Sequence, residues 1–398
     1  MKSLIPALLT LFFACSFRVE AQAKNTDRPS VLLINVDDWN DWNSVLEGHS
    51  QAITPNIERF AKKGVTFSHA ICASPSCVPS RPALFTGIAP SRSGNISNDS
   101  GKRPWRFYAG SETITIPKLF SQNGWTSIGI AKNFHRGDGP EFDTYIPPFK
   151  TPKKLKKVGI NLNSSAIWDI ADIPVSEMGD YKAASAAIKT IQSQEGPLFL
   201  SAGIYCPHVP WIVPQAYFDL YPPETLKLSE RRVEDLDDLP ERLKLLAGFE
   251  AKFGKGYHQK LVEKGYDKQF VRAYLASVTF ADEQVGRILD AWYASSYAKT
   301  GYVVLWSDHG YMLGEKNAWS KIKPWYDSSR SNFMIAGPGL PKGAVCAKAV
   351  SLLDLYPTLV ELVDLPKPPQ VLDGNSLMPL LNNPDAKWDR PVRMTSQM

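Results

Sequence analysis

Cysteine is scarce in this chain, and its few cysteines do not form an evident disulfide framework. The 398 residues include five cysteines: Cys15, Cys72, Cys77, Cys206 and Cys346. A chain of this length buries enough apolar surface to fold without disulfides, and spacing alone does not pair the last four. At least one thiol is therefore available for a chemical role.

Long hydrophobic runs are confined to the N-terminus. Lys2 precedes an apolar run of 14 residues, which is followed by the small-residue sequence "AQA" at 21–23. A span of the bilayer needs ~20 apolar residues, so the pattern predicts a secretory signal peptide over residues 1–23 rather than an anchor. We therefore expect a secreted or periplasmic protein. Lipid attachment at Cys15 is the alternative, although "FFAC" lacks the small residues that such a site needs.

Several other features are missing. The sequence has no internal repeat, no low-complexity tract and no glycine-rich phosphate loop, which argues against solenoids, disordered tails and P-loop nucleotide sites. The net charge of +5 falls to +4 when Lys2, Arg18 and Glu20 leave with the signal peptide. This mild basicity suits a polyanionic partner, but it equally fits a solvated surface of mixed sign. We expect no nucleic-acid partner and, after signal removal, no membrane partner.

The rest of the chain alternates strand patterns with helix patterns. Continuous apolar runs, which are typical of strands buried on both faces, occupy 30–36, 126–131, 198–204, 302–308 and 332–337. Amphipathic or capped helix patterns occupy 54–64, 115–124, 180–196, 269–294 and 351–365, the first with Thr54 as its expected cap. This order predicts an α/β fold with a mostly parallel central sheet between helices.

Polar side chains follow four of these predicted strands. They are Asp37, Asp38, Lys132, His135, His208, Asp308 and His309. Ligands of open α/β sheets bind beyond the carboxyl ends of the strands, so we expect these groups to converge. Carboxylate oxygens suit Ca²⁺ or Mg²⁺, whereas lysines beside a metal imply an anionic substrate such as a sulfate or phosphate ester.

Cys77 begins the segment "CVPSRPALFTG", which ends at Gly87. From composition alone this cysteine is a buried small hydrophobe, half of a disulfide or a nucleophile. The segment resembles the C-x-P-S-R signature of the type I sulfatases. In that family a modifying enzyme reads the Pro and Arg in the unfolded chain and oxidises the cysteine to formylglycine during export. The resemblance implies that Cys77 is the precursor of this aldehyde.

The resemblance extends over residues 29 to 365. It includes "PSVLLINVDDWN", "GIAKNFHRG", "PHVPW" and "WSDHGYMLGEKNAWSK", and the Asp-His pair is closest to the iduronate-2-sulfatase-like branch. It implies an alkaline-phosphatase-like fold, with a catalytic domain over 24–370. Residues 371–398 would begin a small C-terminal subdomain that is incomplete.

The resemblance also implies a role for each residue. The metal, Ca²⁺ rather than Mg²⁺, would be held by Asp37, Asp38, Asp308, His309 and the modified Cys77. Lys132 and Lys321 would neutralise the sulfuryl oxygens, and Arg81 would anchor the formylglycine. The hydrated aldehyde attacks sulfur, His208 protonates the leaving oxygen, and His135 takes the proton that allows sulfate to leave.

One departure from the family leaves the substrate open. Cys206 stands where the iduronate branch often has lysine, so the identity of the sugar is in doubt. The expected function is hydrolysis of sulfate esters on a sulfated polysaccharide or oligosaccharide. The alternatives are a phosphonate or phosphate ester hydrolase of the same superfamily, and a non-catalytic polyanion-binding protein if Cys77 stays a thiol.

Overall fold

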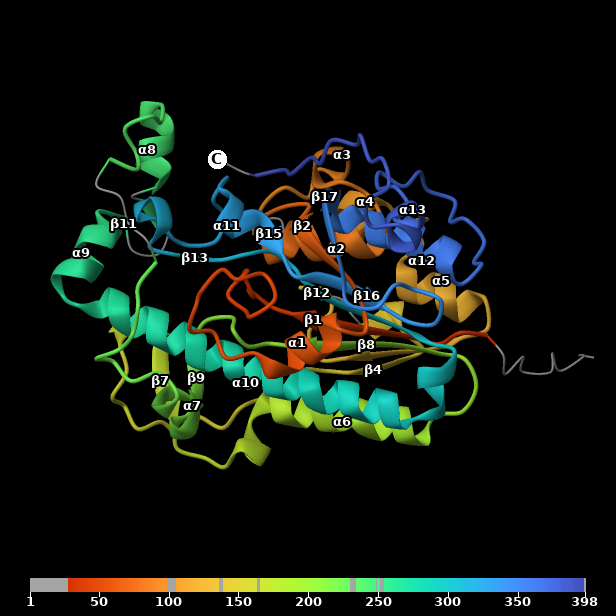
Figure 1. Cartoon of the computed structure of the whole chain (residues 1–398), viewed down its shortest axis with the longest axis horizontal. Helices are drawn as coiled ribbons and strands as arrows, with labels where there is room; N and C mark the ends of the chain where they lie inside the picture. The colour runs from red at the N-terminus through yellow and green to blue at the C-terminus, as the bar shows by residue number, and fades with distance from the viewer. Residues whose placement is uncertain are drawn as a thin grey trace, which may run out of the picture.

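A nine-stranded sheet forms the centre of the molecule, with helices on both faces (Figure 1). The computed structural model describes residues 28–98, 105–135, 139–162, 165–229, 234–247, 249–250 and 254–396. The predicted signal peptide and Cys15 lie outside these residues. Within the described part of the chain, none of the helices combines the length and the apolar character that crossing a membrane requires.

The sheet has a parallel half and a mixed half. Its strands, in spatial order, are β15 (Arg330–Ser331), β2 (Gly64–Ile71), β16 (Phe333–Ala336), β12 (Tyr302–Ser307), β1 (Val31–Val36), β8 (Leu198–Ile204), β3 (Thr126–Ile130) and β4 (Thr144–Ile146). β17 (Ala344–Ser351) pairs with β2 in parallel. The pairs from β12 to β4 are parallel, whereas β16 is antiparallel to both of its neighbours.

The alternation of side chains along β1 explains why both faces carry helices. Val31 and Leu33 pack in one core, and Leu32 and Ile34 pack in the other. The first core includes residues of α2 (Cys77–Thr86), α5 (Ile116–Gln122), α12 (Leu355–Leu362) and α13 (Met378–Asn382). The second includes residues of α1 (Pro55–Ala61), α6 (Gly179–Ser193) and α10 (Tyr266–Ala294). All five predicted strands and all five predicted helical segments are present.

Shorter elements lie around this frame. They are α3 (Pro90–Ser93), α4 (Arg106–Ala109), α7 (Gln215–Asp219), α8 (Glu241–Ala247), α9 (Tyr257–Glu263), α11 (Tyr326–Ser329) and the strand pairs β5 (Asn161–Leu162) with β6 (Ser165–Ala166), β7 (Trp168–Ala171) with β9 (Trp211–Pro214), β10 (Phe249–Glu250) with β11 (Gly254–Lys255), and β13 (Met312–Leu313) with β14 (Trp319–Ser320).

The start of α1 differs in detail from the expectation. Thr54 occupies the cap position, but its side chain makes no capping hydrogen bond. Asp282 of α10 instead accepts hydrogen bonds from the backbone N–H groups of Asn56, at 3.0 Å, and Ile57, at 2.8 Å. A buried carboxylate from a neighbouring helix therefore caps α1, and sequence-local reasoning does not find such a partner.

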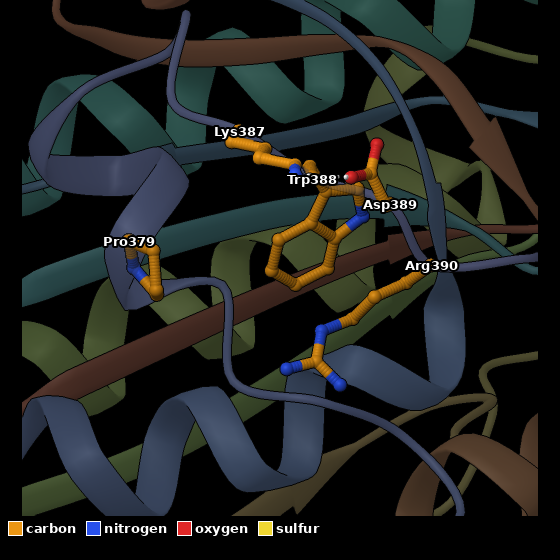
Figure 2. Close-up of a pocket in the computed structure, with 5 residues that line it drawn as sticks. All are labelled: Pro379, Lys387, Trp388, Asp389 and Arg390. Atoms are coloured by element: carbon orange, nitrogen blue, oxygen red, sulfur yellow. Dashed lines mark ion pairs between the residues drawn. The ribbon is translucent and has the colours of Figure 1, made fainter.

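The C-terminal segment packs against the central sheet domain. Leu377, Leu380 and Leu381 are buried in the same core as α12. Beyond α13, a surface hollow of about 340 Å³ is lined by Pro379, Lys387, Trp388, Asp389 and Arg390 (Figure 2). We call this the C-terminal hollow. Whether residues 371–398 begin a separate subdomain stays a prediction.

Candidate active site

The pair Asp37–Asp38 meets the pair Asp308–His309 because the strands before them, β1 and β12, are parallel neighbours. Val36 of β1 lies opposite Ser307 of β12, so the residues that follow each strand come out at the same edge of the sheet. Asp38 has a φ of 61°, in the left-handed region, and this sharp turn places its backbone N–H 3.1 Å from Oδ1 of Asp308. The carboxylates of Asp37 and Asp38 are consequently directed to the point that Asp308 and His309 also face.

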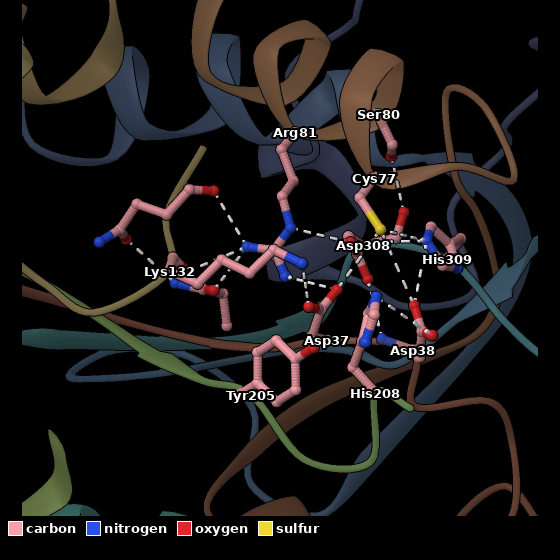
Figure 3. Close-up of polar contacts among 12 residues, drawn as sticks. Asp37, Asp38, Cys77, Ser80, Arg81, Lys132, Tyr205, His208, Asp308 and His309 are labelled. Carbon is pink, nitrogen blue, oxygen red and sulfur yellow. Dashed lines mark hydrogen bonds and ion pairs between the residues drawn. The ribbon is translucent and has the colours of Figure 1, made fainter. Parts of the chain in front are cut away.

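Cys77 is the first residue of α2, a helix with every side chain buried. Its Sγ lies 3.2 Å from Nε2 of His309, 3.6 Å from Oδ1 of Asp37 and 3.9 Å from Oδ1 of Asp38. These groups surround the sulfur in Figure 3. The segment that carries the sulfatase-like signature therefore places its cysteine directly over the carboxylates at the strand ends.

Arg81 follows Cys77 by one helical turn and points to the same side. It is fully buried; its Nε donates to Oδ2 of Asp308 at 2.8 Å, and a second guanidinium nitrogen lies 3.2 Å from Oδ1 of Asp37. The third nitrogen donates to Oδ1 of Asn35 at 2.8 Å and to the carbonyls of Lys132 and Asn133, each at 3.0 Å. Burial alone would lower the pKa of Arg81, but Asp308 and Asp37 raise it, so this cation stays charged.

Two lysines approach the cluster from different loops. Lys132 follows β3, and its ammonium group contacts the carboxylate of Asp37. Lys321 donates to Oδ1 of Asp38 at 2.6 Å and to Sγ of Cys77 at 3.0 Å. Burial acts to lower the pKa of each lysine, but the neighbouring carboxylates outweigh it and raise both values.

The loop that carries Lys321 is conformationally unusual. Its neighbours Ser320 and Ile322 have φ angles of 71° and 66°. A β-branched residue such as Ile322 rarely adopts this conformation, which costs on the order of 1–3 kcal/mol and persists where tertiary contacts enforce it. One such contact is the hydrogen bond from the Ile322 N–H to the carbonyl of Pro75, at 2.9 Å, just before Cys77.

The three histidines differ in their relation to the cluster. Nδ1 of His309 pairs with the Gly310 carbonyl at 2.9 Å, so it carries the proton and leaves Nε2 free to bind a metal. Nδ1 of His208 pairs with the Val209 carbonyl at 2.6 Å, and its Nε2 lies 3.9 Å from Oδ2 of Asp38. The side chain of His135 is exposed at the margin and is among the groups that lower the pKa of Cys77.

The charges around position 77 favour an anion there. Burial acts to raise the pKa of the Cys77 thiol, but Lys321, Lys132 and His309 outweigh it and bring the pKa well below its usual value. The two lysines would also stabilise a negatively charged oxygen at this position.

The donor set also fits a hard divalent cation. One ligand atom from each of Asp37, Asp38, Cys77, Asp308 and His309 lies within 4.8 Å of all the others, and all five residues are buried. Oδ2 of Asp38 is buried without a hydrogen-bond partner, although such an atom normally has one. Three carboxylates offset the charges of Arg81, Lys132 and Lys321, so a bound dication would give the cluster the net positive charge that attracts an anionic ester.

Some supporting residues were not anticipated from the sequence. Asn35 accepts from Arg81 and donates to Oδ1 of Asn133 at 3.1 Å, and the hydroxyl of Ser201 donates to the same oxygen at 2.5 Å. The signal was present, because Asn35 and Ser201 are polar residues inside otherwise apolar strand patterns. A polar side chain in a buried strand costs free energy unless it is hydrogen-bonded, so each such residue indicates a buried hydrogen-bond partner.

Comparison with known proteins identifies the family. A family model described as Sulfatase matches residues 29–365. A protein described as a sulfatase, from Formosa agariphila, is 36% identical over 368 residues, which cover 86% of this chain and 70% of the relative. Iduronate 2-sulfatase of Mus musculus is 26% identical, over 92% of this chain and 74% of its own length.

Solved structures give the same fold. The phosphonate monoester hydrolase of Agrobacterium radiobacter has a TM-score of 0.76 at 21% identity, over 89% of this chain and 77% of that one. At this identity the likeness concerns the fold alone, which is the expected alkaline-phosphatase-like one. The match over residues 29–365 and the relative at 36% identity show more: the chain belongs to the sulfatase family, as a type I sulfatase that hydrolyses sulfuric esters.

Proposed function

We propose that this sulfatase removes sulfate from a sulfated polysaccharide or oligosaccharide, and that it uses a formylglycine made from Cys77 beside a bound Ca²⁺. One observation carries the proposal: Sγ of Cys77 lies 3.0 Å from Nζ of Lys321 and 3.6 Å from Oδ1 of Asp37. A nucleophile at this point faces both a cation-binding carboxylate and a group that holds a sulfuryl oxygen.

The aldehyde allows the sulfated intermediate to release sulfate, which an intermediate formed on serine or cysteine could not do in the same way. When hydrated, formylglycine supplies one hydroxyl that attacks sulfur and a second whose O–H bond electrons re-form the aldehyde as the bond to sulfate breaks. A serine sulfate has no second hydroxyl and could not release its product in this way. Water then adds to the aldehyde and restores the hydrate.

The residues of this chain have separable tasks. Lys132 and Lys321 bind the sulfuryl oxygens and offset charge that develops on them. Arg81 is held by two carboxylates and three carbonyl-type oxygens, so it fixes α2 and position 77 relative to the strand ends. Asp37, Asp38, Asp308 and His309 would hold the Ca²⁺, which supplies Lewis-acid stabilisation of the same oxygens.

Two histidines are assigned the proton transfers. Because Nδ1 of His208 pairs with a backbone carbonyl, its Nε2 is the atom that faces the cluster and gives a proton to the leaving alcohol oxygen. His135 takes the proton from the second hydroxyl when sulfate leaves. Its exposed position lets this proton pass to solvent. The proton that the attacking hydroxyl loses passes to a neighbouring carboxylate, since Oδ1 of Asp37 lies 3.6 Å from Sγ at position 77. Exchange with solvent then returns one proton to His208 for the next turnover.

Export and maturation belong to the same proposal. We infer that residues 1–23 direct secretion and are removed, and that a formylglycine-generating enzyme converts Cys77 before folding. The burial of Cys77 supports this order, because an enzyme cannot reach a side chain that is 2% exposed in the folded protein.

A panel of esters tests the proposed function. Release of sulfate would be measured from defined sulfated saccharides, including 2-sulfated uronic acids, and from choline sulfate and an aryl sulfate. Phosphate and phosphonate monoesters would be included, with Cys77→Ala as the matched blank. We expect the highest kcat/KM on a sulfated saccharide. A preference for phosphonate or phosphate esters would overturn the proposal, as would binding of a polyanion without turnover by protein that retains the thiol.

A further inference from the structure

The position of His208 determines where the leaving alcohol must lie. A group that protonates the leaving oxygen needs that oxygen within about 2.6–3.2 Å of its nitrogen. The ring centroid of Tyr205 is 4.8 Å from that of His208, and the two rings are tilted by 43° relative to each other. The two side chains lie near each other (Figure 3). The carbon atoms of an alcohol whose oxygen is held by His208 can therefore reach the Tyr205 ring.

Tyr205 is open to a ligand but held in place. Its side chain is 38% exposed, which is unusual for a large aromatic residue directly beside a buried charged cluster. Its hydroxyl donates to the carbonyl of Val209 at 3.0 Å, and its backbone N–H donates to Oδ1 of the buried Asp180 at 2.8 Å. A side chain fixed in this way loses little conformational entropy when a ligand packs on it.

The ring also lies beside the cation that faces the sulfate. Nζ of Lys132 is 5.5 Å from the Tyr205 ring centroid. Tyr205 thus lies next to both a sulfuryl-binding lysine and the histidine that protonates the alcohol. This arrangement places an aromatic surface beside the first residue of the substrate rather than at a distant subsite.

We propose that Tyr205 is a stacking platform for the sugar ring that carries the sulfate, and that it makes the enzyme favour cyclic alcohols over short acyclic ones. The inference rests on the proposed function and extends it to the recognition of the alcohol. The apolar C–H face of a pyranose buries well against a flat ring, and a short alkyl chain leaves most of that ring in water.

The test compares three proteins on two substrates. Wild type, Tyr205→Leu and Tyr205→Phe would be assayed on the preferred sulfated saccharide and on a short acyclic alkyl sulfate, whose leaving group is similarly poor. For Tyr205→Leu we expect KM for the saccharide to rise about tenfold, the effect of 1.4 kcal/mol. The alkyl sulfate should change by less than about twofold. Tyr205→Phe keeps the ring and loses only the hydrogen bond to Val209, so its KM for the saccharide should rise by no more than about twofold.

A third measurement separates recognition of the sugar from damage to the site. The inhibition constant of inorganic sulfate reports binding of the anion alone, so it should be the same in all three proteins. An equal loss on both substrates in Tyr205→Leu, or an unchanged saccharide KM, would overturn the platform. If instead no protein released sulfate from any ester, the proposed function would fail, and that outcome is recognised in wild type before any variant is compared.

Discussion

The buried cluster around Cys77 and the C-terminal hollow both gather charged groups, but they hold them in opposite ways. In the hollow, Lys387 pairs with Asp389 at 3.2 Å while the two side chains remain 90% and 75% exposed. In the cluster, Arg81, Asp37 and Asp308 are completely buried. Exposed pairs contribute about 0–1 kcal/mol, whereas buried charges lose their hydration and depend on every partner. Burial of these charges costs desolvation free energy, and a group of charges that is buried despite this cost indicates a functional site.

The largest difference between the two regions should appear at the nucleophile. Cys77→Ala should lower kcat by at least about 10³-fold, because the variant lacks the atom that attacks sulfur. The unfolding midpoint should change little, because the substitution leaves the rest of the fold intact. Cys346→Ala is the matched control, since Cys346 is also buried but is absent from the cluster, and it should retain activity within about twofold of wild type. Substantial turnover by Cys77→Ala would refute the assignment of the nucleophile.

The buried ion pairs should matter far more for stability than an exposed one. Arg81→Met leaves Asp37 and Asp308 without their main partner and should lower the free energy of unfolding by about 3–5 kcal/mol. Arg59→Met removes a pair with Asp290 whose side chains are 54% and 63% exposed, so its cost should stay below about 1 kcal/mol. Denaturant titrations of the two variants make the comparison. Similar losses would mean that the cluster is no more sensitive than the surface.

Removal of a divalent cation should affect only the cluster. Dialysis against excess EDTA should reduce kcat/KM by about 10²-fold, because the carboxylates then offset the positive groups that bind the ester. Added Ca²⁺ should restore activity and raise the melting temperature, since a ligand of the folded state stabilises it. Full activity in EDTA, with no shift in melting temperature on adding Ca²⁺, would contradict a functional metal.

A subtler difference should separate the acid from the rest of the cluster. His208→Ala should reduce kcat on sugar sulfates by about 10²-fold and on an activated aryl sulfate by less than about tenfold, because only the poorer leaving group needs a proton. The ratio of the two losses is the informative quantity. Equal losses on both substrates would argue against His208 as the acid.

The smallest effect is expected in the C-terminal hollow. Lys387→Ala and Asp389→Ala should each leave kcat/KM within about twofold of wild type and stability within about 0.5 kcal/mol, because the pair is exposed and solvated. A large activity loss in either variant would show that the comparison between the two regions is wrong, and that the hollow contributes to the site.

Sequence patterns were most informative where local chemistry determines structure. The runs that became β1, β8 and β12 are apolar on both faces, so their strand character and the polar residues after them were readable. β2 and β17 were not foreseen, because each mixes exposed and buried positions without a continuous apolar run. Their pairing depends on residues nearly 280 positions apart, such as Cys346 opposite Phe67, which no local pattern encodes.

In the site, too, some residues could be predicted from local sequence patterns and others could not. The strand-end carboxylates and the Cys77 signature were evident in the sequence, and the structure brings them within contact distance. The residues that support them were not evident, since Asn35, Asn133 and Ser201 act through partners far along the chain. Tyr205 escaped notice for a different reason: an exposed tyrosine gains significance only when its neighbours in space are known.

The most direct test of the central claim is the mass of the peptide that contains residue 77, measured on active enzyme alongside its rate of sulfate release. Conversion of cysteine to formylglycine lowers the mass of this peptide by about 18 Da. The account predicts that specific activity rises in proportion to the converted fraction and extrapolates to zero for the unconverted chain. Because the hydrated aldehyde has nearly the same mass as cysteine, iodoacetamide, which alkylates only the thiol, is used to tell the two apart. Full activity in protein whose residue 77 is completely alkylated as a thiol would contradict the account.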